Sequence, residues 1–360
     1  MSKKVILSNI TVYSVVHALV DATCVATLFA ITALGQDDPQ KLFQLIIIYD
    51  IIAFSTQPVF GLLVDKFKAP AQAAVLGILL VAASTLLMPV PVLAAVTAGI
   101  GNAIFHVGGG VVSLNLAPGK ATLPGFYVAP GALGLTLGII IGKSGNFVAW
   151  PFLVLLLASA VLIWLLPPSE FPAPRQLPGN LRWFEAVILL LLLSVVIRSL
   201  VGQSLVMPWK SDPLLLIVLT LAVVLGKALG GVLGDRFGWA AVAVTGLAIS
   251  APLLAFFAPI PVLAIAGIFF FNLSMPITLV CLVRILPGKA GFAFGLTTLA
   301  LIVGAFPTFT PLRASTGQPI FVFVTILISA AALYIGLRQF AVHFRDRMLT
   351  RQNRIQSERN

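Results

Sequence analysis

Charged residues are scarce in this sequence. Asp, Glu, Lys and Arg make up 9% of the 360 residues, whereas 59% are hydrophobic, and the mean hydropathy is +1.09. So few charges cannot cover the surface of a soluble globule of this size, and most of the surface must face lipid. The composition therefore excludes a soluble globular protein and predicts a polytopic membrane protein.

Cysteine and histidine are also rare, with two and three residues. Cys24 and Cys281 lie in apolar runs far apart in the chain, and we interpret them as packing residues without a disulfide or a redox role. No pair of Cys or His residues has the spacing of a zinc site. The sequence therefore predicts no metal site and no cofactor.

Acidic residues are half as numerous as basic ones, which leaves a net charge of +11. The basic residues are scattered over short loops and a tail, so they form no continuous patch for nucleic acid. Anionic lipid headgroups at the cytoplasmic face are the expected partner of this charge.

Long apolar runs fill the chain, each close to the roughly 20 residues that a membrane span requires. Six precede a Pro-rich segment at 167–182 and six follow it, and that segment is too rich in proline for a helix, so it predicts an extended cytoplasmic linker. We expect an all-α membrane protein of 12 transmembrane helices in two pseudo-symmetric six-helix bundles. The expected domains are an N-terminal bundle at 1–166, the linker, a C-terminal bundle at 183–340 and a basic cytoplasmic tail at 341–360.

A charged turn motif occurs once in each half. Gly61-Leu62-Leu63-Val64-Asp65-Lys66-Phe67 returns as Gly231-Val232-Leu233-Gly234-Asp235-Arg236-Phe237, each time at the end of an apolar run. Glycine lets two helices approach, and the charged pair ends the span. The repetition indicates an internal repeat, in which the two halves of the chain share one structure. We assign conformational gating to Gly61, Asp65, Lys66, Gly231, Asp235 and Arg236.

This motif resembles the loop between the second and third helices of each half of major facilitator superfamily transporters. The resemblance implies two parallel six-helix halves around a central site, and transport by alternating access rather than enzymatic catalysis. The bias of Lys and Arg toward one side predicts that both termini face the cytoplasm.

Ionisable residues inside membrane spans are costly and are therefore candidates for function. His17 and Asp21 are four residues apart on the first helix, so they share a face, and Asp21 lies near the midplane. We predict that Asp21 carries a coupling proton and that His17 adjusts the proton affinity of Asp21. The alternative is that the two residues form a purely structural pair that holds helices together. The candidates for substrate binding are Arg198, His106, Asp50, Lys227, Asn102 and Asn272.

Arg198 carries a further expectation about the substrate. Ser194-Val195-Val196 echoes Ser14-Val15-Val16, which would place Arg198 opposite His17 across the pseudo-twofold axis. A guanidinium at the same depth in the membrane as His17 can bind a carboxylate or phosphonate with two hydrogen bonds. We therefore expect a central cavity that prefers organic anions. The alternative is that Arg198 neutralises Asp50 and that an apolar cavity accepts lipophilic cations.

A narrower resemblance rests on the first 140 residues. Ser14-x-x-His17-x-x-x-Asp21, Gln57-Pro58 before the turn, the Gly99 to His106 stretch and a Pro130-Gly131 break in the fifth helix are similar to the fosmidomycin-resistance branch of the superfamily. Members of that branch follow this His with Pro and an acid, whereas this chain has Val107 and three glycines.

The branch consists of proton-driven drug exporters of bacterial inner membranes. The resemblance therefore implies efflux of small organic compounds, phosphonate-like anions included, by a monomer in the inner membrane. Alternatives are an importer or divalent metal-ion transporter of the same fold, or a non-transporting membrane protein such as a scaffold or lipid-modifying enzyme. The interfacial loops are too short to build an enzyme site, which favours transport.

Overall fold

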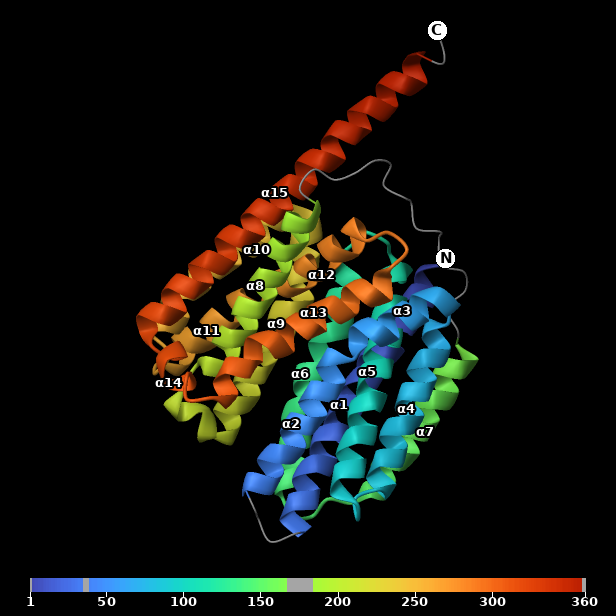
Figure 1. Cartoon of the computed structure of the whole chain (residues 1–360), viewed down its shortest axis with the longest axis vertical. Coiled ribbons are helices and arrows are strands. Elements are labelled where there is room, and N and C mark those ends of the chain that lie inside the picture. The colour runs from blue at the N-terminus through green and yellow to red at the C-terminus, as the bar shows by residue number, and fades with distance from the viewer. Residues whose placement is uncertain (1, 35–38, 167–183, 358–360) are drawn as a thin grey trace.

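The computed structural model describes residues 2–34, 39–166 and 184–357, and every regular element within these ranges is a helix (Figure 1). The linker predicted at 167–182 lies outside the described residues. Apolar sequence with few charges explains this result, because a backbone in lipid must satisfy its own hydrogen bonds within the helix.

The first half of the chain forms seven helices. They are α1 (Lys3–Leu34), α2 (Pro39–Ser55), α3 (Gln57–Phe67), α4 (Pro70–Leu86), α5 (Pro91–Leu116), α6 (Thr122–Lys143) and α7 (Ala149–Leu165). The second half comprises α8 (Phe184–Ser204), η1 (Pro208–Ser211), α9 (Pro213–Phe237), α10 (Trp239–Phe256), α11 (Pro261–Asn272), α12 (Ser274–Ile285), α13 (Ala290–Ala305), η2 (Phe306–Phe309), α14 (Arg313–Thr316) and α15 (Pro319–Ser357).

The helices correspond closely to the predicted spans. Ten helical segments of the described residues are long and apolar enough to cross a membrane, with α2–α3, α11–α12 and α13–η2 each counted as one segment. The shorter apolar helices α4 and α7, of 17 residues each, match the remaining two predicted spans. The all-helical, multi-pass membrane fold is confirmed.

Two spans are divided into two α-helices each. The second span is interrupted at Thr56, between α2 and α3, and the tenth at Leu273, between α11 and α12. Pro58 lies in the first turn of α3, where its missing N–H costs nothing because a helix start leaves that donor unpaired. The second interruption lies beside Ser274, whose hydroxyl accepts a hydrogen bond from Arg198.

The break predicted at Pro130-Gly131 is wrong, because α6 runs unbroken through both residues. Proline removes the N–H that would bond the carbonyl of Phe126 one turn earlier. Ser14 Oγ of α1 donates to that carbonyl at 3.1 Å. The neighbouring helix therefore supplies the missing hydrogen bond, and α6 continues.

The two halves pack together mainly along two helix pairs, α3 with α13 and α6 with α9. Figure 1 shows the first half in blue and green beside the second half in yellow to red, with α1 beginning and α15 ending on the same side of the molecule. The apolar part of α15, Pro319–Val342, matches the last predicted span, and the helix continues to Ser357. The tail predicted at 341–360 therefore begins inside α15.

Cys24 and Cys281 are both buried and free, as expected of packing residues.

Candidate functional site

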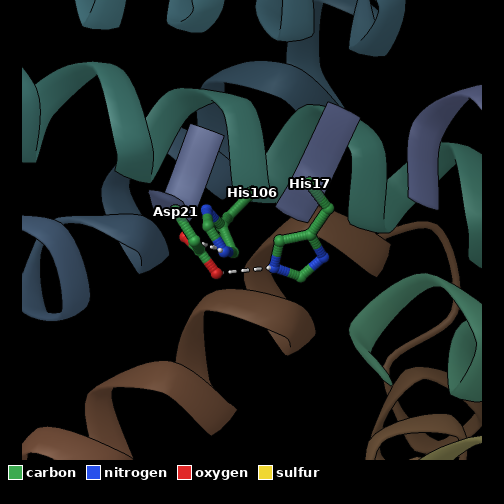
Figure 2. Close-up of side chains that lie close together, drawn as sticks. All are labelled: His17, Asp21 and His106. Atoms are coloured by element: carbon green, nitrogen blue, oxygen red, sulfur yellow. Dashed lines mark ion pairs between the residues drawn. The ribbon is translucent and has the colours of Figure 1, made fainter. Parts of the chain in front are cut away.

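Asp21 of α1 lies between two imidazoles, one from its own helix and one from α5. His17 Nε2 is 3.3 Å from Asp21 Oδ2, and His106 Nε2 is 3.5 Å from Asp21 Oδ1 (Figure 2). Asn102, one turn before His106 on α5, donates from Nδ2 to Asp21 Oδ1 at 2.9 Å. Asp21 is only 6% exposed, so this group is removed from water.

Backbone carbonyls determine which nitrogen of each imidazole faces Asp21. His17 Nδ1 is 2.7 Å from the carbonyl oxygen of Tyr127 on α6, and His106 Nδ1 is 2.9 Å from that of Asn102. A carbonyl oxygen can only accept, so each Nδ1 must carry a hydrogen. In the neutral imidazoles both Nε2 atoms therefore present lone pairs to the carboxylate.

This arrangement brings electron-rich atoms together, so a shared proton or a cation among them would be favourable. A proton on either imidazole converts the contact with Asp21 into a charge-assisted hydrogen bond. A metal ion could serve instead, because the ligand atoms of His17, Asp21 and His106 lie within 4.8 Å of one another. The site can therefore hold a cation, and the residues come from two helices that a change in packing could separate.

Arg198 belongs to a second polar cluster, between α8 and α12. Its Nε donates to the Ser194 carbonyl at 3.1 Å, while its terminal nitrogens donate to Ser274 Oγ at 2.7 Å and Thr278 Oγ1 at 3.0 Å. The residue is 8% exposed. Within the described residues it has no ion pair, so the alternative in which Asp50 neutralises Arg198 has no support from this geometry.

The remaining predicted substrate residues are placed separately. Lys227 of α9 faces the first cluster closely enough to interact electrostatically with Asp21 and His106, but makes no hydrogen bond or ion pair among the described residues.

Asp50 of α2 is half-buried and joins neither cluster. Asn272 donates to the Ile268 carbonyl of its own helix at 2.8 Å. The structure thus gathers His17, Asp21, Asn102 and His106, and separates Arg198, Asp50 and Asn272 from them.

The repeated turn motif joins the two halves. Asp65, at the end of α3, accepts the backbone N–H groups of Gly291 and Phe292 in the first turn of α13, at 2.8 and 2.9 Å. Asp235, at the end of α9, accepts those of Ala121 and Thr122 at the start of α6, both at 3.0 Å. Each carboxylate therefore caps a helix N-terminus of the opposite half, where a negative charge is favoured.

The glycines and bases of the motif have different surroundings. A Cβ atom at Gly61 would overlap the Gly291 carbonyl, and one at Gly231 would overlap that of Ala121, so both glycines permit the contact between halves. Lys66 Nζ and the Arg236 guanidinium lie over the rings of the adjacent phenylalanines, 5.7 and 5.2 Å from the centroids.

Several residues of the two clusters were not assigned roles from the sequence. Tyr127 contributes its backbone carbonyl to the first cluster and Gly131 lies against it, while Ser274 and Thr278 contribute hydroxyls to the second. Pro130 was the available signal near the first, because it leaves the carbonyl of Phe126, next to Tyr127, for a polar side chain of a neighbouring helix. The hydroxyls of α12 had no such marker, because serine and threonine are common in membrane helices.

No protein-family profile matches this chain, and no curated protein matches its sequence. Solved structures do match it. The E. coli fucose:proton symporter FucP is 14% identical, with a TM-score of 0.68, and the match covers 93% of this chain and 99% of FucP.

Two further structures show the same similarity. A structure of FucP in the outward conformation, described as a major facilitator superfamily transporter, is 14% identical over 91% of this chain and 99% of its own, with a TM-score of 0.62. A bacterial homologue of the iron transporter ferroportin, outward-facing, is 14% identical over 94% of this chain and 99% of its own, with a TM-score of 0.59. These neighbours are transporters and not enzymes, and they do not bear on the fosmidomycin-resistance branch. The chain therefore has the major facilitator fold that its repeated turn motif predicted.

Proposed function

We propose that this protein is a proton-coupled secondary active transporter that exports small organic anions by alternating access of its two halves. The observation that carries the proposal is the buried Asp21 carboxylate between His17 Nε2 and His106 Nε2, at 3.3 and 3.5 Å. The fold, which is shared with a proton symporter, supports a transporter in general.

Proton exchange at Asp21 has a direct structural consequence. With a proton in the cluster, α1 and α5 are joined by a charge-assisted hydrogen bond; without it, the carboxylate oxygens and the Nε2 lone pairs repel each other. The packing of α1 against α5 and α6 therefore depends on whether the proton is present. That dependence can link proton binding to the movement of the two halves.

The positive charges of the second half favour an anionic substrate. Arg198 is buried and bonded to neutral partners only, and two of its five N–H donors remain without a partner among the described residues. A buried guanidinium without a carboxylate is costly, and an incoming carboxylate or phosphonate would remove that cost. Lys227, on α9, adds a second positive charge from the same half.

The direction of transport has two candidates. Export by antiport follows from the resemblance of the first 140 residues to drug exporters, and we favour it. Import by symport is supported by the neighbour that is described as a fucose:proton symporter. In either case we place the protein as a monomer in the inner membrane, with both termini cytoplasmic and its basic residues against anionic headgroups.

Purified protein in liposomes with an internal pH-sensitive dye tests the proposal. Adding an organic phosphonate or carboxylate outside should move protons across the membrane, opposite to the substrate for antiport and with it for symport. Asp21→Asn should abolish proton movement while leaving substrate exchange intact, because the amide can neither carry the proton nor stabilise a protonated imidazole. Glu185→Gln is the matched control, since it also converts a carboxylate to an amide, but at an exposed position.

Full proton-coupled transport by Asp21→Asn would exclude Asp21 as the proton carrier. Absence of any substrate-dependent proton movement in the wild type, with substrate exchange present, would exclude proton coupling itself.

A further inference from the structure

We propose that His17, Asp21 and His106 form a binding site for a divalent first-row transition-metal ion of the zinc, cobalt or nickel type. No pair of Cys or His residues has zinc spacing in the sequence, because His17 and His106 lie on two helices that meet only in the folded protein. Binding at this site does not depend on the protein being a transporter.

Each imidazole donor already has a separation from the Asp21 carboxylate close to the one that such an ion needs. Metal–ligand distances of about 2.0–2.2 Å in a tetrahedral site place neighbouring donors about 3.3 Å apart. The two Nε2-to-carboxylate distances are 3.3 and 3.5 Å, and all three donors lie within 4.8 Å of one another. Figure 2 shows the carboxylate of Asp21 with an imidazole from each helix directed toward it.

Each donor is also held by a second partner, as metal ligands usually are. The Nδ1 atoms of His17 and His106 bond backbone carbonyls, which leaves the Nε2 lone pairs available to a metal. Asn102 Nδ2 holds Asp21 Oδ1 at 2.9 Å. No donor has to break its existing second contact to bind an ion, so the site is preorganised.

Gly131 of α6 packs closely against two of the donors. A Cβ atom at this position would lie 2.5 Å from His17 Nε2 and 2.7 Å from Asp21 Oδ2, too close for either atom to remain in place. The missing side chain therefore lets the α6 backbone pack directly against these two donors, and any side chain here would displace them. This is a second observation, independent of the donors themselves.

The ligand types select the class of metal. Imidazole suits zinc, copper, nickel and iron, whereas carboxylate, carbonyl and water oxygens suit magnesium and calcium. Two imidazoles with one carboxylate therefore favour a transition metal over magnesium. Cobalt(II) is the useful probe, because it occupies zinc-type sites and its visible absorption reports the ligand geometry.

Titration of the purified full-length protein with cobalt(II) tests this proposal. We expect one saturable site per chain with a visible absorption band, displaced by zinc and not by magnesium. His106→Gln should raise the Kd by at least about 100-fold, because even loss of an outer partner costs about 10–100-fold. Gly131→Ala should weaken binding similarly, although all three ligands remain.

The controls separate this site from surface binding. Gly202→Ala adds the same methyl group where nothing lies within 4 Å, and should bind cobalt like the wild type. His343→Gln removes the remaining histidine and should also leave binding unchanged. Thermal unfolding checks that each variant is folded; if Gly131→Ala is not, His106→Gln decides, because its Nδ1 contact is within its own helix.

Absence of saturable cobalt binding to the wild type overturns the proposal. Unchanged binding in folded His106→Gln, or loss of binding in His343→Gln, would assign the metal elsewhere and overturn it as well. None of these measurements involves transport, so their failure is distinct from failure of the proposed function.

Discussion

Gly61 of α3 and Gly291 of α13 pack backbone to backbone across the two halves of the molecule. A Cβ atom on Gly291 would lie 2.7 Å from the Gly61 carbonyl oxygen and 3.1 Å from Asp65 Oδ1. The contact brings the N-terminus of α13 to Asp65, which caps it, and the pair Gly231 and Asp235 repeats the arrangement at α6. Two capped helices therefore hold one end of the molecule together.

Asp65→Asn should loosen this end of the molecule. The amide retains an acceptor but loses the charge, and hydrogen bonds to charged groups contribute about 1.5–3 kcal/mol, so the population of separated halves should rise by roughly tenfold or more. Spin labels on Lys68→Cys and Lys289→Cys, both exposed positions on opposite halves, measure the separation. We expect a longer distance component in the Asp65→Asn protein.

The matched control for this prediction is Asp212→Asn. Asp212 caps α9 through the N–H groups of Leu214 and Leu215, so the chemistry is the same but stays within one half. An equal change in label separation in both variants would mean that cap loss acts through general destabilisation and not through the contact between halves.

Ser14→Ala should destabilise the protein because it leaves the Phe126 carbonyl without a donor. An unsatisfied buried acceptor costs about 1–3 kcal/mol. Pro130→Ala supplies a backbone N–H at the position that bonds this carbonyl, so it should reverse most of the loss. Thermal unfolding of the two single variants and the double variant measures the coupling.

Ser159→Ala provides the comparison for Ser14→Ala. Its hydroxyl also bonds a helix carbonyl, that of Leu155, but this hydrogen bond is exposed and no proline is involved. Additive effects of Ser14→Ala and Pro130→Ala would mean that the Ser14 hydroxyl does not replace the helix bond that Pro130 removes.

Arg198→Gln should weaken binding of organic anions by roughly tenfold or more, because a charge-assisted hydrogen bond contributes about 1.5–3 kcal/mol. Neutral analogues of the same size should bind as before. Arg198→Lys should recover only part of the affinity, since an ammonium group is a point charge without the guanidinium fork. Equilibrium binding of a phosphonate and of its neutral ester to the purified protein measures both.

Arg338→Gln, which removes an exposed arginine, should leave anion binding unchanged. Tighter binding of cations than of similarly sized anions by the wild type would contradict the proposed anion preference and favour the apolar-cavity alternative.

Thiol labelling can establish the orientation in the membrane. Ser144→Cys, after α6, should react with an impermeant reagent on intact cells, whereas Lys289→Cys should react only after permeabilisation, because the positive-inside rule places the basic turns in the cytoplasm. Cys24 and Cys281 are buried and should contribute little background. The reverse pattern of labelling would invert the predicted topology.

The membrane class and the order of the spans are properties of the sequence itself. A span is local: a stretch of about 20 apolar residues forms a helix in lipid whatever surrounds it, so composition alone predicts it. The repeated Gly-x-x-x-Asp turn is also local, and it indicated the fold, whereas its contact between the halves is visible only in the structure. The spacing of His17 and Asp21 placed them on one helix face for the same reason.

Contacts between helices depend on how those helices rotate and pack, which no local pattern specifies. His106 reaches Asp21, and Arg198 turns to Ser274 and Thr278 instead of joining that cluster, only because of tertiary packing. The continuity of α6 through Pro130 was likewise decided by α1, since a helix bond lost to proline can be replaced only by a neighbouring helix. The sequence determined the helices and the candidate charges, and the packing decided which charges share a site.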